Sequence, residues 1–268
     1  MTFRFGLIVA LLGGATTAVA ACPEPDAGRV DIYPTAQVLP ENLLRVYVYY
    51  PRAMAASAGL SDIRLLDADG TPMDGVFLPT REDLWSQDRH RLTVLMDPGR
   101  VKTGLDASEA MGRALRSGHS YTLEVSGGSM DLEGCVLGQN TTVAFQVGPP
   151  DLDPPDPGEW ELSTPKLGSR APLRVNLGSP HDHLSLAFRL RVLDADGSIV
   201  PGQIGLSADE AGWEFIPRAA WKAETYSLTI EDSLEDLAGN RPGVLFDRPS
   251  GQTPEPWLGR LQFQPGLK

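Results

Sequence analysis

The residues best suited to chemistry in this chain are two histidines in the stretch "SPHDHL", His181 and His183. On a β-strand, an H-x-H spacing places both rings on one face, where they could bind copper or zinc. The chain has only 4 histidines, and no cysteine or methionine cluster completes a coordination shell around this pair. We therefore expect a polar loop here and no cofactor, and keep His181 and His183 as metal candidates.

Acidic loops are the second group that could bind an ion, in this case calcium. "LDADG" occurs twice, at 66–70 and 193–197, and "EDSLED" covers 231–236. A calcium loop needs six or more oxygen ligands at ordered spacing, and "LDADG" lacks the third acid and the distal glutamate. Asp-Gly after a strand is a hairpin signal, so we predict turns rather than ion sites.

No sequence pattern for catalysis is present. The chain lacks G-x-S-x-G, H-E-x-x-H and a phosphate-binding glycine loop. "SPHDH" contains Ser, His and Asp, but the members of a triad come from distant segments. The tryptophans could stack on a sugar, yet aromatic residues in β-sandwiches more often pack in the core. We therefore predict no catalytic residues and a protein that is not an enzyme. The tryptophans are Trp85, Trp160, Trp213, Trp221 and Trp257.

The first 21 residues have the order of an export signal. "MTFR" carries a positive charge, "FGLIVALL" is an apolar run too short to span a bilayer, and "GGATTAVAA" offers small residues for cleavage. We predict a signal peptide over 1–21 and a periplasmic or secreted protein. The net charge of −12 argues against nucleic acid and anionic lipid as partners.

The two cysteines, Cys22 and Cys135, allow two outcomes. An even number of cysteines in an exported chain indicates a disulfide. However, "VAAC" is similar to a bacterial lipoprotein box, in which Cys22 would be lipidated and would anchor the protein to the membrane. Cleavage after Ala18–Ala20, "AVA", is the competing interpretation, and the polar "GGATT" before it slightly favours ordinary cleavage.

Five short segments recur in the same order, which indicates two copies of one domain. The pairs include "LLRVYVYYP" with "PLRVNLGSP", "RLLDADG" with "RVLDADG", and "SYTLEV" with "TYSLTI". "DLEGC" at 131–135 lies where "DLAGN" at 236–240 lies in the second copy. The extra residues of the first copy include 97–118, where "SEAMGRAL" predicts a short helix capped by Ser108.

Between the copies, "GPPDLDPPDPGEW" is too rich in proline for a helix or a central strand. We expect a semi-rigid spacer that holds the two domains apart. The predicted boundaries are 28–148 for domain 1, 149–159 for the linker and 160–266 for domain 2.

Within each copy the patterns indicate strands. Runs of four to eight residues rich in Val, Leu, Tyr, Phe and Thr alternate with Gly, Pro, Asp and Asn clusters, as in a β-sandwich. We expect strands at "LAFRLRVL", 186–193, and at "VLFD", 244–247, with "DLAGN" in the connection before this last strand. Asp, Asn and Gly in that motif are turn residues.

The layout "SPHDHL…LDADG…WEFIP…Y.L.I…LEDLAGN" resembles the bacterial Ig-like domains of S-layer and other surface proteins. Together with "LPENLLRVYVYYPRAM", "EDLW" and "DPGRVKTGL", it is similar to a group of exported bacterial proteins with two such domains. The resemblance implies an all-β fold of two Ig-like sandwiches in tandem and a place in the cell envelope, and it implies no reaction.

In such a sandwich the chain enters at the end that carries the connection before the last strand. The resemblance therefore implies that Cys22 can reach Cys135, the residue in place of the turn Asn of the second copy. We expect a structural or protein-binding module whose partner is an envelope protein or a glycan. The alternative is a carbohydrate- or metal-binding accessory protein. Membrane contact is expected only if Cys22 is lipidated.

Overall fold

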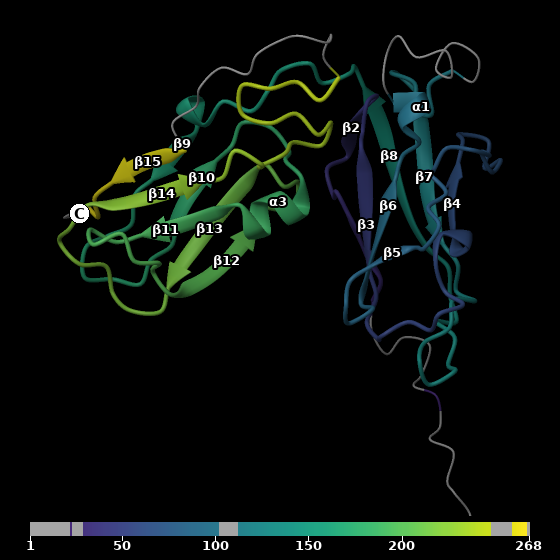
Figure 1. The fold of residues 1–268 in the computed structure, drawn as a ribbon, viewed down its shortest axis with the longest axis horizontal. Coiled ribbons are helices and arrows are strands. Elements are labelled where there is room, and N and C mark those ends of the chain that lie inside the picture. The colour runs from purple at the N-terminus through teal and green to yellow at the C-terminus, as the bar shows by residue number, and fades with distance from the viewer. Residues whose placement is uncertain (1–21, 23–28, 102–111, 248–258, 267–268) are drawn as a thin grey trace, which may run out of the picture.

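The computed structural model describes Cys22 and residues 29–101, 112–247 and 259–266 (Figure 1). The predicted signal peptide, 1–21, and Trp257 lie outside the described residues. So does the first half of the predicted helix in the insertion, while residues 112–115 of its second half are not helical. None of the described helices is long and apolar enough to cross a membrane.

Domain 1 consists of two four-stranded sheets that pack face to face (Figure 1). The first has the order β1-β3-β6-β5 and the second the order β2-β8-β7-β4. All neighbours are antiparallel except β2 and β8, which are parallel. The strands are β1 (Asp31–Tyr33), β2 (Val38–Pro40), β3 (Arg45–Tyr49), β4 (Ile63–Leu66), β5 (Leu84–Trp85), β6 (Arg91–Leu95), β7 (Ser120–Val125) and β8 (Thr141–Gly148), with the helical turns η1 (Leu60–Asp62) and α1 (Pro98–Val101).

Domain 2 repeats this arrangement with a four-stranded and a three-stranded sheet. Their orders are β9-β10-β13-β12 and β11-β14-β15, all antiparallel. The strands are β9 (Glu161–Ser163), β10 (Leu173–Asn176), β11 (Leu190–Leu193), β12 (Gly202–Leu206), β13 (Gly212–Pro217), β14 (Tyr226–Ile230) and β15 (Arg260–Phe263), with helix α3 (His183–Phe188) and the turn η2 (Pro157–Glu159).

Both domains are Ig-like β-sandwiches, and the strand order shows this directly. If β1 and β2 are two halves of one first strand, each domain pairs its first, second, fifth and fourth strands in one sheet. The third, sixth and seventh strands form the other, which is the order of the seven-stranded immunoglobulin fold. The chain is therefore all-β in architecture, as the sequence predicts, and its described helices are short.

Alternating side chains build the core of each domain. In β3, Val46 and Val48 are buried between the sheets, whereas Arg45, Tyr47 and Tyr49 alternate with them and lie on the outer face. In β13, Trp213 and Phe215 fill the corresponding space in domain 2. The outer face of β3 is therefore available for contacts outside its own sandwich.

Two strand predictions are wrong. The predicted strand at 186–193 starts as helix: Asp182 accepts a hydrogen bond from the Ser185 amide at 2.9 Å and caps α3, which runs to Phe188 before β11 begins. The last strand is "RLQF", β15, rather than "VLFD" at 244–247. There the Asn240 side chain accepts a hydrogen bond from the Phe246 amide at 3.0 Å, which holds this segment against the "DLAGN" turn.

The "LDADG" turns are the same in both copies. The side chain of Asp67 accepts hydrogen bonds from the amides of Asp69 and Thr71 at 3.0 and 2.8 Å. Asp194 accepts from the amides of Asp196 and Ser198 at 3.1 and 2.9 Å. Because the first aspartate of each turn is engaged in this way, the pattern is explained by turn formation alone.

Cys22 and Cys135 form a disulfide across 113 residues of sequence, which joins Cys22 to the "DLEGC" turn of domain 1. A crosslink of this length restricts the unfolded chain strongly, and such bonds contribute about 2–4 kcal/mol.

We predict that Cys135→Ser lowers the free energy of unfolding by about 2–4 kcal/mol, since it frees the N-terminal segment. Urea denaturation of the oxidised proteins measures this. Cys22→Ser serves as the control, because it must produce the same loss. Equal stability of the wild type with and without reductant would contradict the prediction.

Candidate functional site: the joint between the domains

The "DLAGN" turn is held together by one carboxylate, that of Asp236. Its Oδ1 accepts hydrogen bonds from the amides of Ala238 and Asn240 at 2.8 and 2.9 Å, and its Oδ2 accepts one from the Asn240 side chain at 2.9 Å. Gly239 has a positive φ of 80°, which a residue with a side chain adopts rarely. These bonds within the turn fix its conformation without any contact from domain 1.

The "DLEGC" turn of domain 1 has the same structure. Asp131 Oδ1 accepts hydrogen bonds from the amides of Glu133 and Cys135 at 3.0 and 2.8 Å. Arg52 forms an ion pair with Asp131 Oδ2 at 2.6 Å. In the second copy, the corresponding oxygen of Asp236 binds the Asn240 side chain instead. The two copies thus contain the same turn, which lies at the joint between the domains in domain 2 and at the disulfide in domain 1.

In domain 2 the turn docks against domain 1. Leu237 at its tip is only 6 % exposed and belongs to the apolar core cluster of domain 1. The Leu44 amide donates a hydrogen bond to the Leu237 carbonyl at 2.9 Å. A Cβ atom at Gly239 would lie 2.6 Å from Leu44 Cδ2, so this glycine is needed for close approach as well as for the turn.

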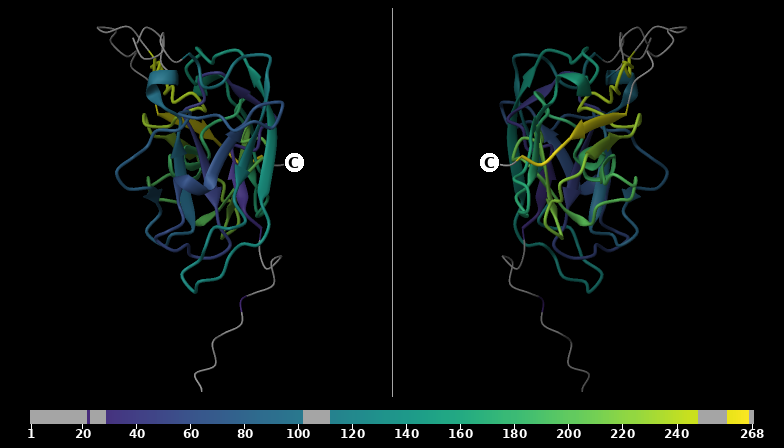
Figure 2. Two further views of the ribbon diagram at one scale, coloured as in Figure 1. Left: turned by 90° about the vertical axis from the view of Figure 1, so that its right-hand side faces the viewer. Right: turned by 90° about the vertical axis from the view of Figure 1, so that its left-hand side faces the viewer.

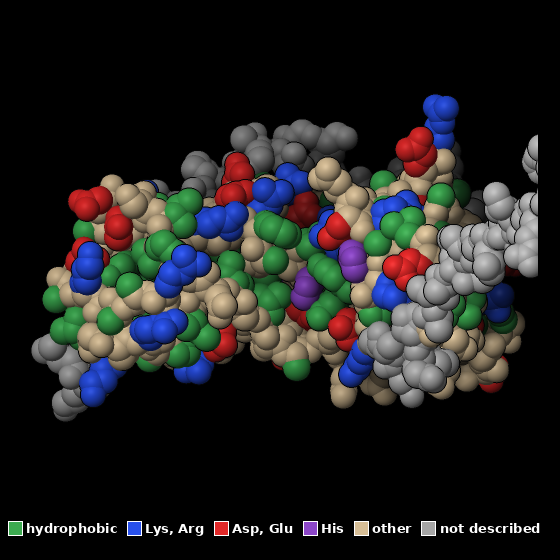
Figure 3. Space-filling model, turned by 90° about the horizontal axis from the view of Figure 1, so that it is seen from below, with side chains coloured by type: hydrophobic (Ala, Val, Ile, Leu, Met, Phe, Trp, Pro, Cys, Tyr) green, Lys and Arg blue, Asp and Glu red, His purple; other side chains and the backbone are tan. Residues whose placement is uncertain are grey.

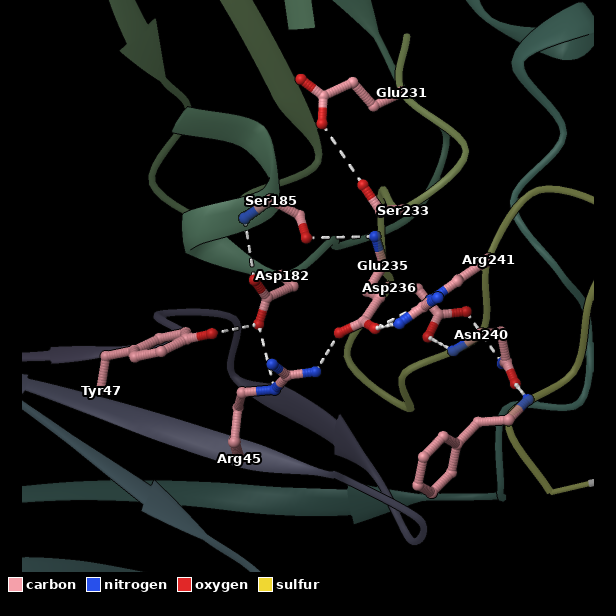
Figure 4. Close-up of polar contacts among 11 residues, drawn as sticks. Arg45, Tyr47, Asp182, Ser185, Glu231, Ser233, Glu235, Asp236, Asn240 and Arg241 are labelled. Atoms are coloured by element: carbon pink, nitrogen blue, oxygen red, sulfur yellow. Dashed lines mark hydrogen bonds and ion pairs between the residues drawn. The ribbon is translucent and has the colours of Figure 1, made fainter. Parts of the chain in front are cut away.

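An ion-pair network lies beside this apolar contact (Figure 4). Arg45 of β3 bonds to Glu235, and its Nε lies 3.6 Å from Asp182 Oδ2. The Tyr47 hydroxyl donates a hydrogen bond to Asp182 Oδ2 at 2.8 Å. Burial raises the pKa of Tyr47, which keeps the hydroxyl protonated as a donor. Arg241 bonds to the other oxygen of Glu235 at 2.7 Å.

Helix α3 is tied to the docked turn from within domain 2. Asp182 caps α3 through the Ser185 amide, and the Ser185 hydroxyl accepts a hydrogen bond from the Glu235 amide at 3.1 Å. The carboxylates that meet Arg45 are therefore fixed in position before the domains meet. This arrangement reduces the side-chain entropy that is lost when the ion pairs form.

A second contact joins the domains through His183. Its ring lies 3.7 Å from the ring of Tyr33, measured between centroids, and its Nδ1 lies 3.6 Å from Glu210 Oε1. Glu210 is 1 % exposed and accepts hydrogen bonds from the Thr35 amide at 2.8 Å and the Thr35 hydroxyl at 3.0 Å. Thr35 and Tyr33 belong to domain 1, so one buried glutamate of domain 2 binds its partner domain directly.

The hairpin that carries Glu210 has a counterpart in domain 1, which the sequence repeats given above do not include. In "SQDR" and "SADE", the serine hydroxyl donates to the aspartate two residues later at 2.5 Å. The fourth residue, Arg89 or Glu210, has a φ of 56° or 54°. The shared Ser-x-Asp spacing was the available signal. Arg89 bonds to the carbonyls of its own domain, whereas Glu210 faces domain 1.

His181 has a different environment from His183, so the two rings do not share a face. His181 is 1 % exposed, its Nδ1 lies 2.8 Å from the Ser179 carbonyl, and its ring meets Trp160 edge-on. Burial lowers the pKa of His181 to about 4. Among the described residues, no group of three or more His, Cys, Asp or Glu side chains is placed to hold a metal ion.

The proline-rich spacer is attached to both domains. The Asp151 carbonyl accepts hydrogen bonds from Asn42 of domain 1 at 2.8 Å and from Asn240 of domain 2 at 3.3 Å. Burial and the nearby Asp151 raise the pKa of Asp236 to about 7. The expectation that the spacer holds the domains apart is wrong, because Leu237 and Glu210 contact domain 1 directly.

The tryptophans described by the structure pack rather than form a platform. Trp160, Trp213 and Trp221 are buried in the core cluster of domain 2. Trp85 lies against Tyr50 and under the guanidinium of Arg89. In the joint, the carboxylates of Asp182, Glu235 and Glu210 accept hydrogen bonds from domain 1 or form ion pairs with it.

Comparisons with known proteins add no family. No family model and no curated protein sequence matches this chain. Among solved structures, a chimeric titin Z1Z2 matches with 13 % identity and a TM-score of 0.22, over 74 % of this chain and 86 % of that one. The Ig1-2 module of the Drosophila receptor protein tyrosine phosphatase DLAR matches with 11 % identity and a TM-score of 0.25, over 78 % and 93 %.

The S-layer protein rSbsC(31-844) matches with 16 % identity and a TM-score of 0.29; this chain spans only 22 % of its length. All of these scores are low, so the strand order described above, and not the likeness to these proteins, identifies the chain as two Ig-like domains.

We predict that Leu237→Ala lowers the free energy of unfolding by about 2–4 kcal/mol, since it removes a buried leucine from the joint. Leu132→Ala is the matched control: Leu132 has the same place in the "DLEGC" turn but is 64 % exposed, so its loss should be below about 0.5 kcal/mol. Denaturation of both variants decides this, and equal losses would contradict insertion of Leu237.

In domain 1, Met54 pairs with Asp131 as His181 pairs with Asp236 in domain 2, so methionine is the residue type at the equivalent position. We predict that His181→Met makes stability less sensitive to acid. In the unfolded chain His181 is protonated below its ordinary pKa of 6.5, whereas in the folded protein its pKa is about 4. Between these two pH values the unfolded state therefore binds one more proton than the folded state. Wild-type stability should therefore fall relative to the variant as pH drops from 6.5 to 4, by a difference of the order of 3 kcal/mol. Parallel stability curves for the two proteins would contradict the prediction.

Proposed function

We propose that this chain is a non-enzymatic scaffold of the bacterial cell envelope that presents protein-binding surfaces at a fixed angle. The observation that carries the proposal is the joint. Leu237, the Arg45 network and the Glu210 contact together fix domain 2 against the outer face of a domain 1 sheet. A scaffold needs such a fixed angle, whereas two domains on a flexible tether do not maintain one.

Two observations support export as part of this proposal, one from the sequence and one from the fold. The signal-like segment 1–21 directs the chain out of the cytoplasm. The Cys22–Cys135 disulfide favours an oxidising compartment such as the periplasm or the cell exterior. Because Cys22 is engaged in the disulfide, we favour cleavage that leaves Cys22 unlipidated. The S-layer-type assignment is part of this proposal and rests on the sequence pattern alone.

Recovery of partners from the native envelope tests the proposal. The tagged mature chain should retain one envelope protein preferentially. The Arg45→Glu variant should not retain this protein, because its new carboxylate would lie against those of Asp182 and Glu235 and the repulsion would separate the domains. Arg64→Glu is the matched control, since Arg64 is 63 % exposed and lies on the other sheet of domain 1.

Two results would redirect the proposal. Retention of the partner by Arg45→Glu would show that the joint does not matter for binding. Tight binding on a glycan array, or stoichiometric uptake of copper or zinc without a protein partner, would favour a carbohydrate- or metal-binding accessory protein instead.

A further inference from the structure

Strand β12 is an open edge of domain 2. It pairs only with β13 among the described strands and ends the sheet β9-β10-β13-β12. The Arg218 amide bonds to the Pro201 carbonyl, and the Ser207 amide bonds to the Gly212 carbonyl. Since bonded pairs alternate along an antiparallel ladder, Gly202, Ile204 and Leu206 turn their backbone donors and acceptors away from β13.

This edge lacks the protection that the same edge has in domain 1. In domain 1 the edge strand begins at Phe77 and Leu78, which pair with Met96 and Leu95. The segment "PTRED" at 79–83 then interrupts it before the short strand β5. Proline, charge and interruption are the usual protections of edge strands. In contrast, β12 is "GQIGL", continuous and uncharged.

A pocket of about 260 Å³ opens between this edge and β11. Its lining is almost entirely apolar and includes Trp213, Phe215 and Ile204. Ile199 and Phe188 add exposed apolar surface near it, at 63 % and 54 % exposure. Helix α3 lies beside the arrowhead end of β12, away from its Gly202 end (Figure 1).

One positive charge borders this apolar surface. Arg191 is the one charged residue in the pocket lining; it donates to the Leu190 carbonyl, and no carboxylate of the described residues lies within ion-pair distance of it. From below, Lys, Arg, Asp and Glu side chains are all scattered among apolar ones over the domain 2 half of the molecule, so Arg191 is the charge that bears on the pocket itself (Figure 3). The occupant should therefore carry negative charge.

We propose that β12 binds an extended segment of a partner protein, with apolar residues at alternate positions and acidic residues beside them. The segment adds a strand to the sheet, its main chain bonds to Gly202 and Ile204, and one apolar side chain enters the pocket. A second copy pairing through the same edge would bring another Arg191, and its β12 carries no carboxylate to pair with this one. This inference rests on the proposed protein-binding function and names the surface that performs it.

A random linear nonapeptide phage library, selected on the full mature chain, provides the probe. The peptides enriched should alternate apolar residues and carry Asp or Glu. Ile204→Pro should weaken a synthesised winner at least tenfold, since it removes an outward N–H without removing a β12–β13 bond. Ile204→Thr keeps the N–H and should stay within threefold, and Arg191→Gln should weaken acidic peptides most at low salt.

Absence of an enriched pattern, or equal binding by a folded Ile204→Pro variant, would overturn the inference. Far-UV circular dichroism checks that this variant folds, and Ile204→Glu, which places a like charge beside the acidic peptide, is the substitute if it does not. A wild-type dimer in light scattering that Ile204→Pro abolishes would replace the peptide with a second copy. If the envelope partner binds Ile204→Pro normally, the proposed function stands and only this surface is wrong.

Discussion

The structure depends on a turn that is rigid before it is used. Asp236 closes the "DLAGN" loop through two backbone amides and one side-chain amide, and this fixes the direction of Leu237 and Glu235. A flexible loop would lose conformational entropy on docking, whereas a preformed loop loses little. The joint combines Leu237 and Glu210 of domain 2 with Arg45 of domain 1, which lies between two carboxylates of domain 2.

Seen along the long axis, the two domains lie one behind the other (Figure 2). Figure 1 shows that the end of domain 2 with α3 faces the side of domain 1 with β3. The duplication explains how one fold performs two tasks. The end of domain 2 carries "DLAGN", Glu210 and α3, and it contacts the tyrosines of β1 and β3. The corresponding end of domain 1 carries "DLEGC" and Arg89, and there the same turn binds the N-terminal Cys22.

The sequence predicts the repeats, the β-sandwiches and the turns because each depends on local patterns. The "LDADG" and "DLAGN" loops depend on the bonds of one aspartate to amides two and four residues away. The joint was not predictable in this way, because Arg45 and Asp182, or Thr35 and Glu210, are far apart in sequence. Helix α3 was missed because "LAFRL" is apolar in a manner that suits a buried strand as well as a short helix.

The central claim is that the domains form one fixed unit through the joint. Small-angle X-ray scattering of the full mature chain, compared with Arg45→Glu, tests it most directly. The account predicts that one rigid, bent arrangement fits the wild-type curve and that the variant shows a larger maximum dimension. A wild-type curve that requires separated domains at many angles, unchanged by Arg45→Glu, would contradict it.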